Sequence, residues 1–450
     1  MTALAPQPTT APRAGHAPPR FAALLPGPVA GLGALAVLLL WWRTTPSVIG
    51  PAGWLTESGR ITGLLAGYGA AVLLLLMARI PVLEHHVGTD RLARWHAMAG
   101  RYTVGLALAH TLTILWGYTL TSRTDPVTQT VDVLHYPEML KGTLGFLLML
   151  LVGATSARAA RRRLPYEAWH LIHMSSYLAV FAAFSHQLVL GAQFVASPLA
   201  RVFWYALYLS AAALLAWYRF LTPIVIAFRH RMRVAEVRVE SPGVVSVYVT
   251  GRRLDELGAR AGQFFRWRFL APDLWWAANP YSLSAAPRPD LLRITVKAAG
   301  RHSAALADLR PGTRIWAEGP YGALTADRME SGRALLLGGG VGITPLRALF
   351  ETLPGDLTLV YLARTPEDLA LREELEALAA ARGARAVFFV DEPAGHRLPL
   401  TASSLRRVVP DLPTRDVYLC GPPGMARAAR TALREAGVPR HRIHHESFEF

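Results

Sequence analysis

The sequence contains a single cysteine, Cys420, among 450 residues. One cysteine excludes an internal disulfide framework, a CxxC redox pair, a four-cysteine zinc or iron–sulfur site and haem attached through CxxCH. Charge is also scarce, because 17% of the residues are charged whereas 52% are hydrophobic. Soluble proteins carry about a quarter charged residues. The composition therefore argues against disorder and against an ordinary soluble enzyme, and any redox metal must be held by ligands other than sulfur.

The positive charge is unevenly distributed. Residues 1–233 hold 19 Lys and Arg against 7 Asp and Glu, whereas residues 234–450 hold 28 against 24. The excess lies between hydrophobic segments, whereas a nucleic-acid-binding protein would carry it on a soluble face. We therefore expect no nucleic-acid partner. No EF-hand loop occurs in the sequence, so nothing indicates calcium gating.

Six hydrophobic segments are long enough to cross a bilayer as helices, which takes about 20 apolar residues. They follow a tail, residues 1–20, that is expected to be disordered, and they cover residues 21–42, 61–79, 96–120, 139–157, 168–192 and 202–228. A cleaved signal peptide is disfavoured because no small-residue cleavage site follows Arg43. Twelve arginines flank one side, and five basic residues, including Lys141, flank the other. The positive-inside rule then places both termini in the cytoplasm, so segments 96–120 and 168–192 run parallel.

Two pairs of histidines lie within these parallel segments. His96 and His110 are 14 residues apart and His173 and His186 are 13 apart, so each pair spans about 20 Å of helix. Ionisable residues at membrane depth are costly and mark functional sites. We expect His96 to face His173 and His110 to face His186, each couple supplying the two axial ligands of one haem iron. Bare zinc or copper is disfavoured because no third or fourth ligand lies nearby.

Helical geometry does not put the second pair on one face. Thirteen residues turn through about 1300°, which leaves His173 and His186 roughly 140° apart. The helix must bend, contain a bulge, or hold rings whose planes differ. His170 competes with His173 as the inner ligand, the one that faces His96. Arg60 and Arg101 are candidates to neutralise haem propionates, and for Arg60 snorkelling to the interface is the alternative.

The sequence pattern changes after residue 230. Short alternating runs separated by Gly and Pro predict antiparallel strands in a barrel, at residues 233–239, 243–250, 263–270, 291–297 and 313–319. From residue 334 strands alternate with helices, which predicts a parallel doubly wound sheet. The expected fold is thus a multi-domain membrane protein with a six-span α-helical bundle over 21–228, an antiparallel β-barrel over 229–328 and an α/β doubly wound nucleotide-binding domain over 329–450.

A glycine-rich loop joins the first strand of the α/β domain to a helix. It reads Gly338, Gly339, Gly340, Val341, Gly342, Ile343, Thr344, Pro345. Glycines let the backbone approach a diphosphate, and the helix N-terminus supplies N–H groups, so this context predicts a dinucleotide site. The final proline departs from the ordinary fingerprint. A second loop, Cys420 to Met425, follows a strand at its carboxyl end, where ligands of such sheets bind; a simple turn beside a small buried residue is the alternative.

In kind and order these features resemble the ferric reductase and NADPH oxidase superfamily, in which a six-helix two-haem domain precedes a ferredoxin–NADP reductase-like module. The histidine spacings are similar to those of eukaryotic NADPH oxidases. The resemblance implies two haem b groups, FAD and NADPH, with NADH as the alternative nucleotide. It also implies a multi-pass protein in the cell (plasma) membrane of a bacterium, with the lipid membrane as its partner.

The resemblance further implies flavin-binding residues. Asn279-Pro280-Tyr281-Ser282 is similar to the flavin motif of the family, in which the aromatic ring packs on the isoalloxazine and the hydroxyl approaches its N5. Asn279 stands where the family has Arg or His, which puts a charge contact to the FAD diphosphate in doubt. A second stretch resembles the FAD-phosphate loop of the family and contains Gly300, His302 and Ser303.

Nucleotide-binding and catalytic roles follow from the same resemblance. The stretch Gly340–Pro345 resembles the nicotinamide-nucleotide loop, and Cys420, Gly421 and Pro422 resemble the motif whose cysteine lies beside the nicotinamide. The terminal Phe450, with Phe448 as the alternative, is similar to the aromatic residue that shields the flavin. Arg364 follows the second strand of the α/β domain and is a candidate ligand for a 2′-phosphate, in a chain with only two lysines. The expected catalytic residues are Tyr281, Ser282, Cys420 and Phe450.

The implied function is a transmembrane oxidoreductase that moves electrons from cytoplasmic NADPH through FAD and two b-type haems to an acceptor on the outer side. A ferric chelate as acceptor makes it a ferric reductase, which we favour by analogy of fold. Dioxygen makes it a superoxide-producing NADPH oxidase. An alternative of another class is a membrane redox-partner haem protein that hands electrons to a bound periplasmic or extracellular protein. A non-redox scaffold explains neither the histidines nor the glycine loop.

Overall fold

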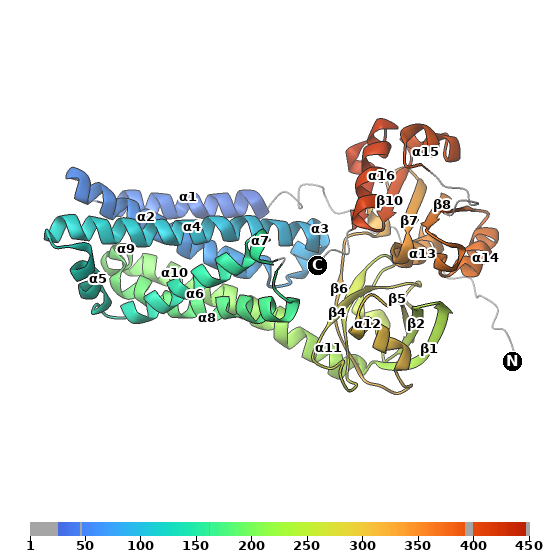
Figure 1. Ribbon diagram of the computed structural model, residues 1–450, viewed down its shortest axis with the longest axis horizontal. Coiled ribbons are helices and arrows are strands. Elements are labelled where there is room, and N and C mark those ends of the chain that lie inside the picture. Colours follow the sequence, from blue (N-terminus) through green and yellow to red (C-terminus); the bar gives the residue numbers. More distant parts are fainter. Residues whose placement is uncertain (1–25, 46, 162, 392–398, 447–450) are drawn as a thin grey trace. The chain divides into compact units, whose positions relative to one another are not determined.

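The computed structural model describes residues 26–45, 47–161, 163–391 and 399–446. They divide into two compact units (Figure 1), one reaching to Thr222 and the other starting at Pro223. All described strands belong to the second unit. The predicted N-terminal tail and the predicted flavin-shielding residues Phe448 and Phe450 lie outside the described residues.

The first unit is built from helices. They are α1 (Pro26–Thr44), α2 (Gly50–Leu76), α3 (Pro81–Val87), α4 (Thr89–Ser122), α5 (Pro126–Leu134), α6 (Met139–Ser156), α7 (Arg158–Arg161), α8 (Tyr166–Leu190), α9 (Ala192–Ala196) and α10 (Pro198–Ala216). A π-helical turn, Trp217–Leu221, joins α10 to α11 (Thr222–His230). Proline occupies the first or second position of α2, α5 and α10, where its missing N–H has no helical partner to lose.

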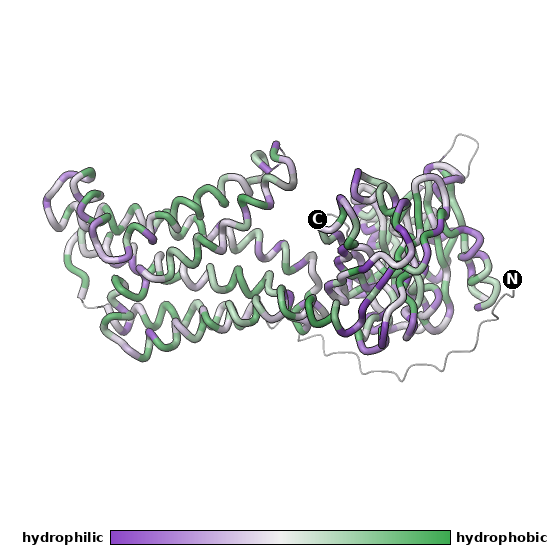
Figure 2. The backbone as a smooth tube through the Cα atoms, turned by 90° about the horizontal axis from the view of Figure 1, so that it is seen from below, coloured by the Kyte–Doolittle hydropathy of each residue, from purple (hydrophilic) through white to green (hydrophobic). Residues whose placement is uncertain are grey.

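Five described helices are long and apolar enough to cross a membrane, and Figure 2 shows the hydrophobic stretches along the helical unit. They are Gly27–Thr44, Gly50–Leu76, Arg91–Ser122, Met139–Ser156 and Pro198–His230. The segment expected to span at 168–192 forms α8 but is not among them. His170, His173 and His186, together with serines and a glutamine, lower its hydropathy. The prediction of six spans is therefore confirmed for five helices only.

Glycines bring the helices of this unit into close contact. A Cβ on Gly63 of α2 would lie 2.6 Å from Nδ1 of His110 on α4, and a Cβ on Gly142 of α6 would lie 3.0 Å from the ring of His186 on α8. A Cβ on Gly145 of α6 would meet the backbone of α8 at 2.7 Å. The two helices that carry the paired histidines are thus each packed against a helix with glycine at the contact.

Hydrogen bonds tie α10 to two of its neighbours. The hydroxyl of Tyr208 donates to the carbonyl of Gly67 on α2 (2.8 Å), and the indole N–H of Trp204 donates to Oε1 of Gln187 on α8 (2.9 Å). Both aromatic residues are buried in the core that these helices share. These two buried donors are therefore satisfied by acceptors on neighbouring helices.

The second unit begins with two three-stranded antiparallel sheets. Their orders are β1-β2-β5 and β4-β3-β6, with β1 (Arg233–Ser241), β2 (Val244–Thr250), β3 (Phe264–Phe269), β4 (Asn279–Ser282), β5 (Leu291–Lys297) and β6 (Ile315–Tyr321). Isolated bridges join Arg233 to Arg314 and Leu283 to Ile294. All five predicted strands are confirmed. The predicted barrel is met only loosely, by two sheets that are bridged at these points rather than by a continuous ladder.

Alternation along β3 positions the core of these two sheets. Phe265, Trp267 and Phe269 are fully buried, whereas Arg266 and Arg268 between them are partly exposed. This is the pattern of a strand with one face buried in the core and the other face accessible to solvent. The three aromatic residues pack with the inner valines and leucines of β2 and β5.

The rest of the second unit is a five-stranded parallel sheet in the order β11-β10-β7-β8-β9. Its strands are β7 (Arg333–Gly339), β8 (Asp356–Ala363), β9 (Arg385–Val390), β10 (Asp416–Cys420) and β11 (Ile443–Glu446). Helices α13 (Ile343–Thr352) and α14 (Arg372–Arg382) cover one face, and α15 (Ala402–Val408) and α16 (Pro423–Glu435) cover the other (Figure 1). The prediction of a doubly wound parallel sheet is confirmed. The short elements α15 and β11 were not predicted.

Candidate functional site

The helical unit brings the four predicted histidines together as two couples. The ring centroids of His96 and His173 lie 6.0 Å apart, and those of His110 and His186 lie 6.5 Å apart. Each couple joins α4 to α8. His173, rather than the competing His170, is the residue whose ring has this position beside His96.

Backbone carbonyls orient both histidines of α4. Nδ1 of His110 lies 2.7 Å from the carbonyl oxygen of Gly59, and Nδ1 of His96 lies 3.3 Å from that of Leu73. A carbonyl can only accept, so Nδ1 carries the proton and Nε2 is left with a lone pair. Metal-binding histidines characteristically donate their other ring N–H in this way.

The couples fit the axial ligands of a haem. Two imidazoles on one metal, with bonds of about 2 Å, hold their ring centroids roughly 6 Å apart. Among the described residues no group of three or more His, Cys, Asp or Glu side chains could hold a metal ion. A metal between the rings of a couple would therefore take its remaining ligands from a porphyrin, whereas a bare metal site fits poorly.

Helix α8 carries both His173 and His186, whose 13-residue spacing does not place them on one helical face. It is assigned as one α-helix from Tyr166 to Leu190. The planes of the two rings differ by 68° for His96 and His173 but by 33° for His110 and His186. The 13-residue spacing between His173 and His186 is therefore accommodated without a π-bulge, and the two couples differ in the angle between their own rings.

The two arginines proposed for haem propionates have different surroundings. The guanidinium of Arg60 forms an ion pair with Glu57, one helical turn earlier on α2. Glu57 is buried and also accepts from the indole N–H of Trp41 (3.1 Å). Arg101 is exposed on α4. Arg60 therefore already neutralises a buried carboxylate, and a propionate role for either arginine stays a prediction.

We predict that Gly63→Ala disturbs the couple of His110 and His186, called the outer couple from the predicted topology; His96 and His173 are the inner couple. The new methyl group would lie 2.6 Å from Nδ1 of His110, so the ring must move away from the Gly59 carbonyl. Overpacking of this kind costs about 1–3 kcal/mol. The measurement is haem content of the purified protein, which should fall. Gly105→Ala on α4, where a Cβ meets nothing within 4 Å, is the matched control and should retain wild-type haem.

The predicted flavin motif forms β4, which pairs with β3. Tyr281 lies opposite Phe265, and its carbonyl accepts from the indole N–H of Trp267 (2.9 Å). Burial raises the pKa of Tyr281 to about 12. Ser282 is buried, and its hydroxyl has no hydrogen-bond partner among the described residues. An unsatisfied buried hydroxyl costs about 1–3 kcal/mol, so this one is suited to a bound polar group such as the flavin ring.

The structure brings Asn279 and the second predicted FAD loop together. The side-chain amide of Asn279 lies 2.7 Å from Nδ1 of His302, and burial lowers the pKa of His302. A neutral imidazole can accept this hydrogen bond. The Ser303 hydroxyl accepts from the backbone N–H groups of Ala299 (2.9 Å) and Gly300 (3.1 Å). Ser303 therefore shapes the loop through its own backbone.

Arg266 is a residue of this region that sequence reasoning missed. It lies opposite Pro280 on the wet face of β3, where its guanidinium donates to the carbonyl of Ala278 (3.1 Å) and lies 3.4 Å from Glu318. The only sequence signal was the alternation of β3. Arg266 brings a positive charge beside the motif in which Asn279 replaces the usual Arg or His.

The glycine loop and the Cys420 loop are packed backbone against backbone. Gly338 at the end of β7 pairs with Cys420 at the end of β10. A Cβ on Gly342 would overlap the carbonyl group of Cys420 and lie 2.7 Å from the backbone nitrogen of Gly421. Gly340 has φ +53°, which favours glycine. The two predicted nucleotide motifs thus form one surface at the carboxyl edge of the sheet.

Gly342→Ala should therefore impair nucleotide binding strongly. The added methyl group faces immovable backbone, so the two loops must separate, at a cost of about 1–3 kcal/mol. We expect a higher KM for NADPH and a lower Tm, measured by steady-state kinetics and thermal unfolding. An unchanged KM and Tm in Gly342→Ala would contradict this close packing of the two loops.

The other predicted nucleotide residues are placed as follows. Gly339 ends β7, Pro345 is buried in α13, and the Thr344 hydroxyl donates to the Val341 carbonyl (3.0 Å) within the loop. Pro422 precedes α16. Cys420 is fully buried in the apolar core on the α13 side of the sheet. Arg364 is exposed immediately after β8, at the same carboxyl edge as the loops.

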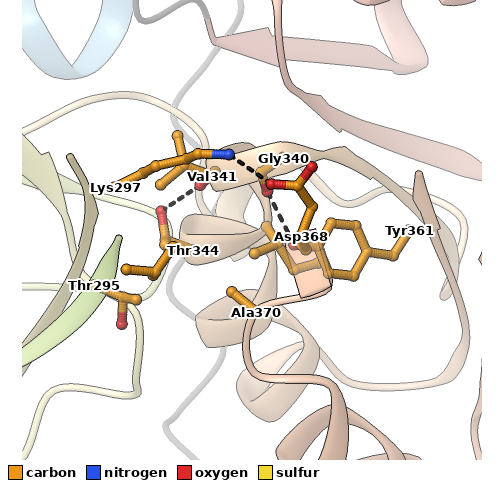
Figure 3. Close-up of a pocket in the computed structure, with 10 residues that line it drawn as sticks. Thr295, Lys297, Gly340, Val341, Thr344, Tyr361, Asp368 and Ala370 are labelled. Atoms are coloured by element: carbon orange, nitrogen blue, oxygen red, sulfur yellow. Dashed lines mark hydrogen bonds and ion pairs between the residues drawn. The ribbon is translucent and has the colours of Figure 1, made fainter. Parts of the chain in front are cut away.

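A pocket lies between the first antiparallel sheet and the glycine loop (Figure 3). Its lining comes from β2 and β5 on one side and from the loop, α13 and the β8 region on the other: Val244, Thr295, Lys297, Gly340, Val341, Ile343, Thr344, Tyr361, Asp368 and Ala370. Nζ of Lys297 lies 2.7 Å from Asp368, and the Tyr361 hydroxyl is 3.2 Å from the Gly340 carbonyl. Sequence reasoning missed Lys297, Tyr361 and Asp368, because only the fold brings them to the loop.

Buried ion pairs hold the antiparallel sheets against the parallel sheet. Nη1 of Arg293 on β5 lies 3.1 and 3.0 Å from the two carboxylate oxygens of Glu374 on α14. Arg347 of α13 pairs with the same carboxylate, and Nη2 of Arg293 donates to the Ser284 carbonyl (2.6 Å). Both arginine side chains are largely buried. Removing one partner of such a network leaves a buried charge, so these pairs fix how the two parts of this unit meet.

Two family models match the chain. A ferric reductase like transmembrane component matches residues 62–184, which include His96, His110 and His173. An oxidoreductase NAD-binding domain matches residues 336–431, which include the glycine loop and Cys420. The order of the two matches is the order of the helical unit and the parallel sheet.

Curated relatives match part of the chain. It is 34% identical over 212 residues to the flavohemoprotein of Bordetella pertussis, covering 42% of this chain and 52% of the relative. It is 32% identical over 184 residues to the glycine betaine monooxygenase reductase subunit of Pseudomonas aeruginosa, covering 37% and 50%. The chain thus spans about half the length of these relatives. Among solved structures, it is 25% identical to the flavohem-like FAD/NAD binding domain of nitric oxide dioxygenase from Vibrio cholerae, with a TM-score of 0.41, covering 48% of this chain and 98% of that one.

Proposed function

We propose that this chain, which joins a ferric reductase-like transmembrane component to an oxidoreductase NAD-binding domain, passes electrons from cytoplasmic NADPH to an acceptor on the outer side of the cell membrane. The observation that carries the proposal is the two histidine couples, at ring separations of 6.0 and 6.5 Å. Imidazoles in membrane helices are costly, and this spacing suits axial ligation of a redox metal.

Each cofactor has residues suited to hold it. The couples His96–His173 and His110–His186 would hold two haems, Tyr281 and the unsatisfied Ser282 hydroxyl would hold FAD, and the glycine loop would hold NADPH. When bound, FAD accepts the hydride of NADPH and haem iron carries single electrons, chemistry that no side chain supplies. The match of an oxidoreductase NAD-binding domain to residues 336–431 supports the nucleotide assignment.

The nucleotide loop would bind phosphate through its backbone N–H groups. The 3-10 turn Gly340–Gly342 leads directly into α13, and its carbonyls accept the N–H of Ile343, the first residue of that helix. The N–H groups at the start of the turn would bind an anionic phosphate. The left-handed Gly340 and the lack of a side chain at Gly342 keep the loop close to the Cys420 loop. Arg364, exposed at the same edge, would pair with a 2′-phosphate, which favours NADPH over NADH.

Tyr281 and Ser282 would orient the flavin ring and shield it from solvent. The half-buried ring of Tyr281 offers an apolar face for an aromatic ring system, and the Ser282 hydroxyl offers one hydrogen bond. Arg266, opposite Pro280, would supply the charge contact to a diphosphate that Asn279 lacks. Asn279 itself is engaged with His302.

We favour a ferric chelate as the acceptor and keep two alternatives. If the two histidines of each couple hold an iron, they would leave no open position on it for a further ligand, so an acceptor would receive its electron without binding the metal. A ferric chelate and dioxygen both meet this condition, the latter giving superoxide. The alternative of another class is delivery of electrons to a bound protein on the outer side.

The test uses the full-length protein in membranes. NADPH consumption is measured with either a ferric chelate or oxygen as the sole acceptor, and detergent-extracted protein is scanned oxidised and after dithionite. We expect low-spin b-type haem, two per chain with one FAD, and faster turnover with the chelate. A colourless protein after expression with ample haem would refute the electron-transfer proposal, whereas superoxide without chelate reduction would move the assignment to an oxidase.

A further inference from the structure

Trp169, in the first turn of α8, stacks on a predicted haem ligand. Its ring centroid lies 5.0 Å from that of His173, with the planes 23° apart. The guanidinium carbon of Arg161 lies over the Trp169 ring, 4.4 Å from its centroid. A cation, an indole and an imidazole thus form a contiguous set at the inner couple.

One hydroxyl connects the members of this set. The indole N–H of Trp169 donates to Oγ of Ser156, at the end of α6, over 3.4 Å, and Nδ1 of His173 lies 3.4 Å from the same oxygen. A serine oxygen has two lone pairs and can accept both N–H groups. If His173 donates from Nδ1, its Nε2 is free to bind a metal.

The anchoring of His173 differs from that of the histidines on α4. His110 and His96 point Nδ1 at backbone carbonyls, at 2.7 and 3.3 Å, and a backbone group cannot rotate away. The contacts of His173 with Ser156 and Trp169 are both made by side chains. The orientation of its ring therefore depends on residues that can be substituted without changing the backbone.

We infer that Trp169 and Ser156 position the ring of His173, and that the charge of Arg161, which lies over Trp169, raises the midpoint potential of the inner haem. The inference rests on the proposed function, because it presumes haem between His96 and His173. Stacking fixes the plane of the imidazole, and the shared serine fixes its tautomer. The charge of Arg161, close to a low-dielectric site, disfavours the more positive, oxidised state of the bound metal.

The experiment isolates the inner haem. In a His110→Leu background the inner couple is the remaining one, so all haem signals report on it. We expect Trp169→Leu to raise the haem dissociation rate by about 10-fold or more, the lower end for loss of a group that orients a metal ligand. Trp169→Phe, which keeps a ring but loses the N–H, should have a smaller effect. Both should shift the g values of the low-spin EPR signal.

Charge is tested separately from stacking. Arg161→Gln should lower the midpoint potential of the inner haem, measured by spectroelectrochemistry, while leaving haem content unchanged. Trp116→Leu, which removes a half-exposed tryptophan from α4, is the matched control and should match the background in every reading. In a His96→Leu background, where only the outer couple remains, Trp169→Leu should also have no effect.

The outcomes separate the inference from the proposed function. Wild-type dissociation rate, EPR signal and potential in both Trp169 variants would overturn the positioning role. An unchanged potential in Arg161→Gln would overturn the role of its charge. Absence of haem from the wild-type protein would instead overturn the proposed function, before any variant is made. If His110→Leu does not fold, the comparison is made on the wild type, where the two low-spin EPR signals are followed separately.

Discussion

The His110→Leu variant is expected to bind one haem instead of two. His110 is the α4 member of the outer couple, and leucine offers no ligand. The Soret absorbance per chain should fall to about half, and turnover with an outer acceptor should fall at least roughly 10–100-fold, the range seen when metal ligation is weakened. Pyridine haemochromogen assay and NADPH-dependent ferric reduction measure the two effects.

Two further histidine variants control for this result. His135→Leu removes a histidine at the end of α5 whose ring, among the described residues, bonds to the Val131 carbonyl of its own helix at 2.7 Å. His170→Leu removes the competing candidate on α8. Both should retain two haems. Unchanged haem content in His110→Leu, or a loss in His170→Leu equal to that expected for His173→Leu, would show that the ligand assignment is wrong.

The second large effect is expected for Tyr281→Ala, which should lose FAD while its haem spectrum stays intact. The half-buried ring of Tyr281 is the proposed packing surface for the flavin, and stacking of this kind contributes about 1–3 kcal/mol. The affinity for FAD should therefore fall roughly 5- to 100-fold, since every 1.4 kcal/mol is tenfold. FAD released on gel filtration and fluorescence titration of the stripped protein measure the change.

The conservative variant decides what the ring contributes. Tyr281→Phe keeps the stacking face and should retain FAD. Because Tyr281 belongs to the second compact unit, neither variant should alter the haem spectrum of the helical unit. Full FAD content in Tyr281→Ala would count against the flavin motif, and a parallel loss of haem would indicate general misfolding instead.

The fold was predictable where the hydrophobic periodicity of the sequence matches the strand or helix that forms. Alternating runs gave every strand of the antiparallel sheets except β4, in which Pro280 and a length of four residues obscure the period. The parallel sheet followed from buried strands alternating with helices. The count of six spans failed at α8, because polar residues of this helix, three histidines among them, lower the hydropathy on which the prediction depends.

The sequence spacing of the histidines was enough to predict how they pair, but not which other side chains they and the motifs would contact. Rise along a helix is enough to match His96 with His173 and His110 with His186, and the ring distances agree. Arg60 illustrates the limit, because its pairing with the buried Glu57 competes with the predicted propionate role. Arg266, Lys297 and Trp169 acquire meaning only from the tertiary contacts that bring them to a motif.

The positions of the two lysines allow the orientation of the chain in the membrane to be tested. Lys141 begins α6 on the flank assigned to the outer side, with a well-exposed side chain, and Lys297 lies in the nucleotide-binding unit, paired with Asp368. No other side-chain amine exists in the chain. An amine-reactive dye that cannot enter intact cells should therefore mark a single peptide around Lys141, and the peptide around Lys297 should become reactive only after the cells are opened. Mass spectrometry of the labelled digest would thus read the direction of insertion from the protein's own chemistry.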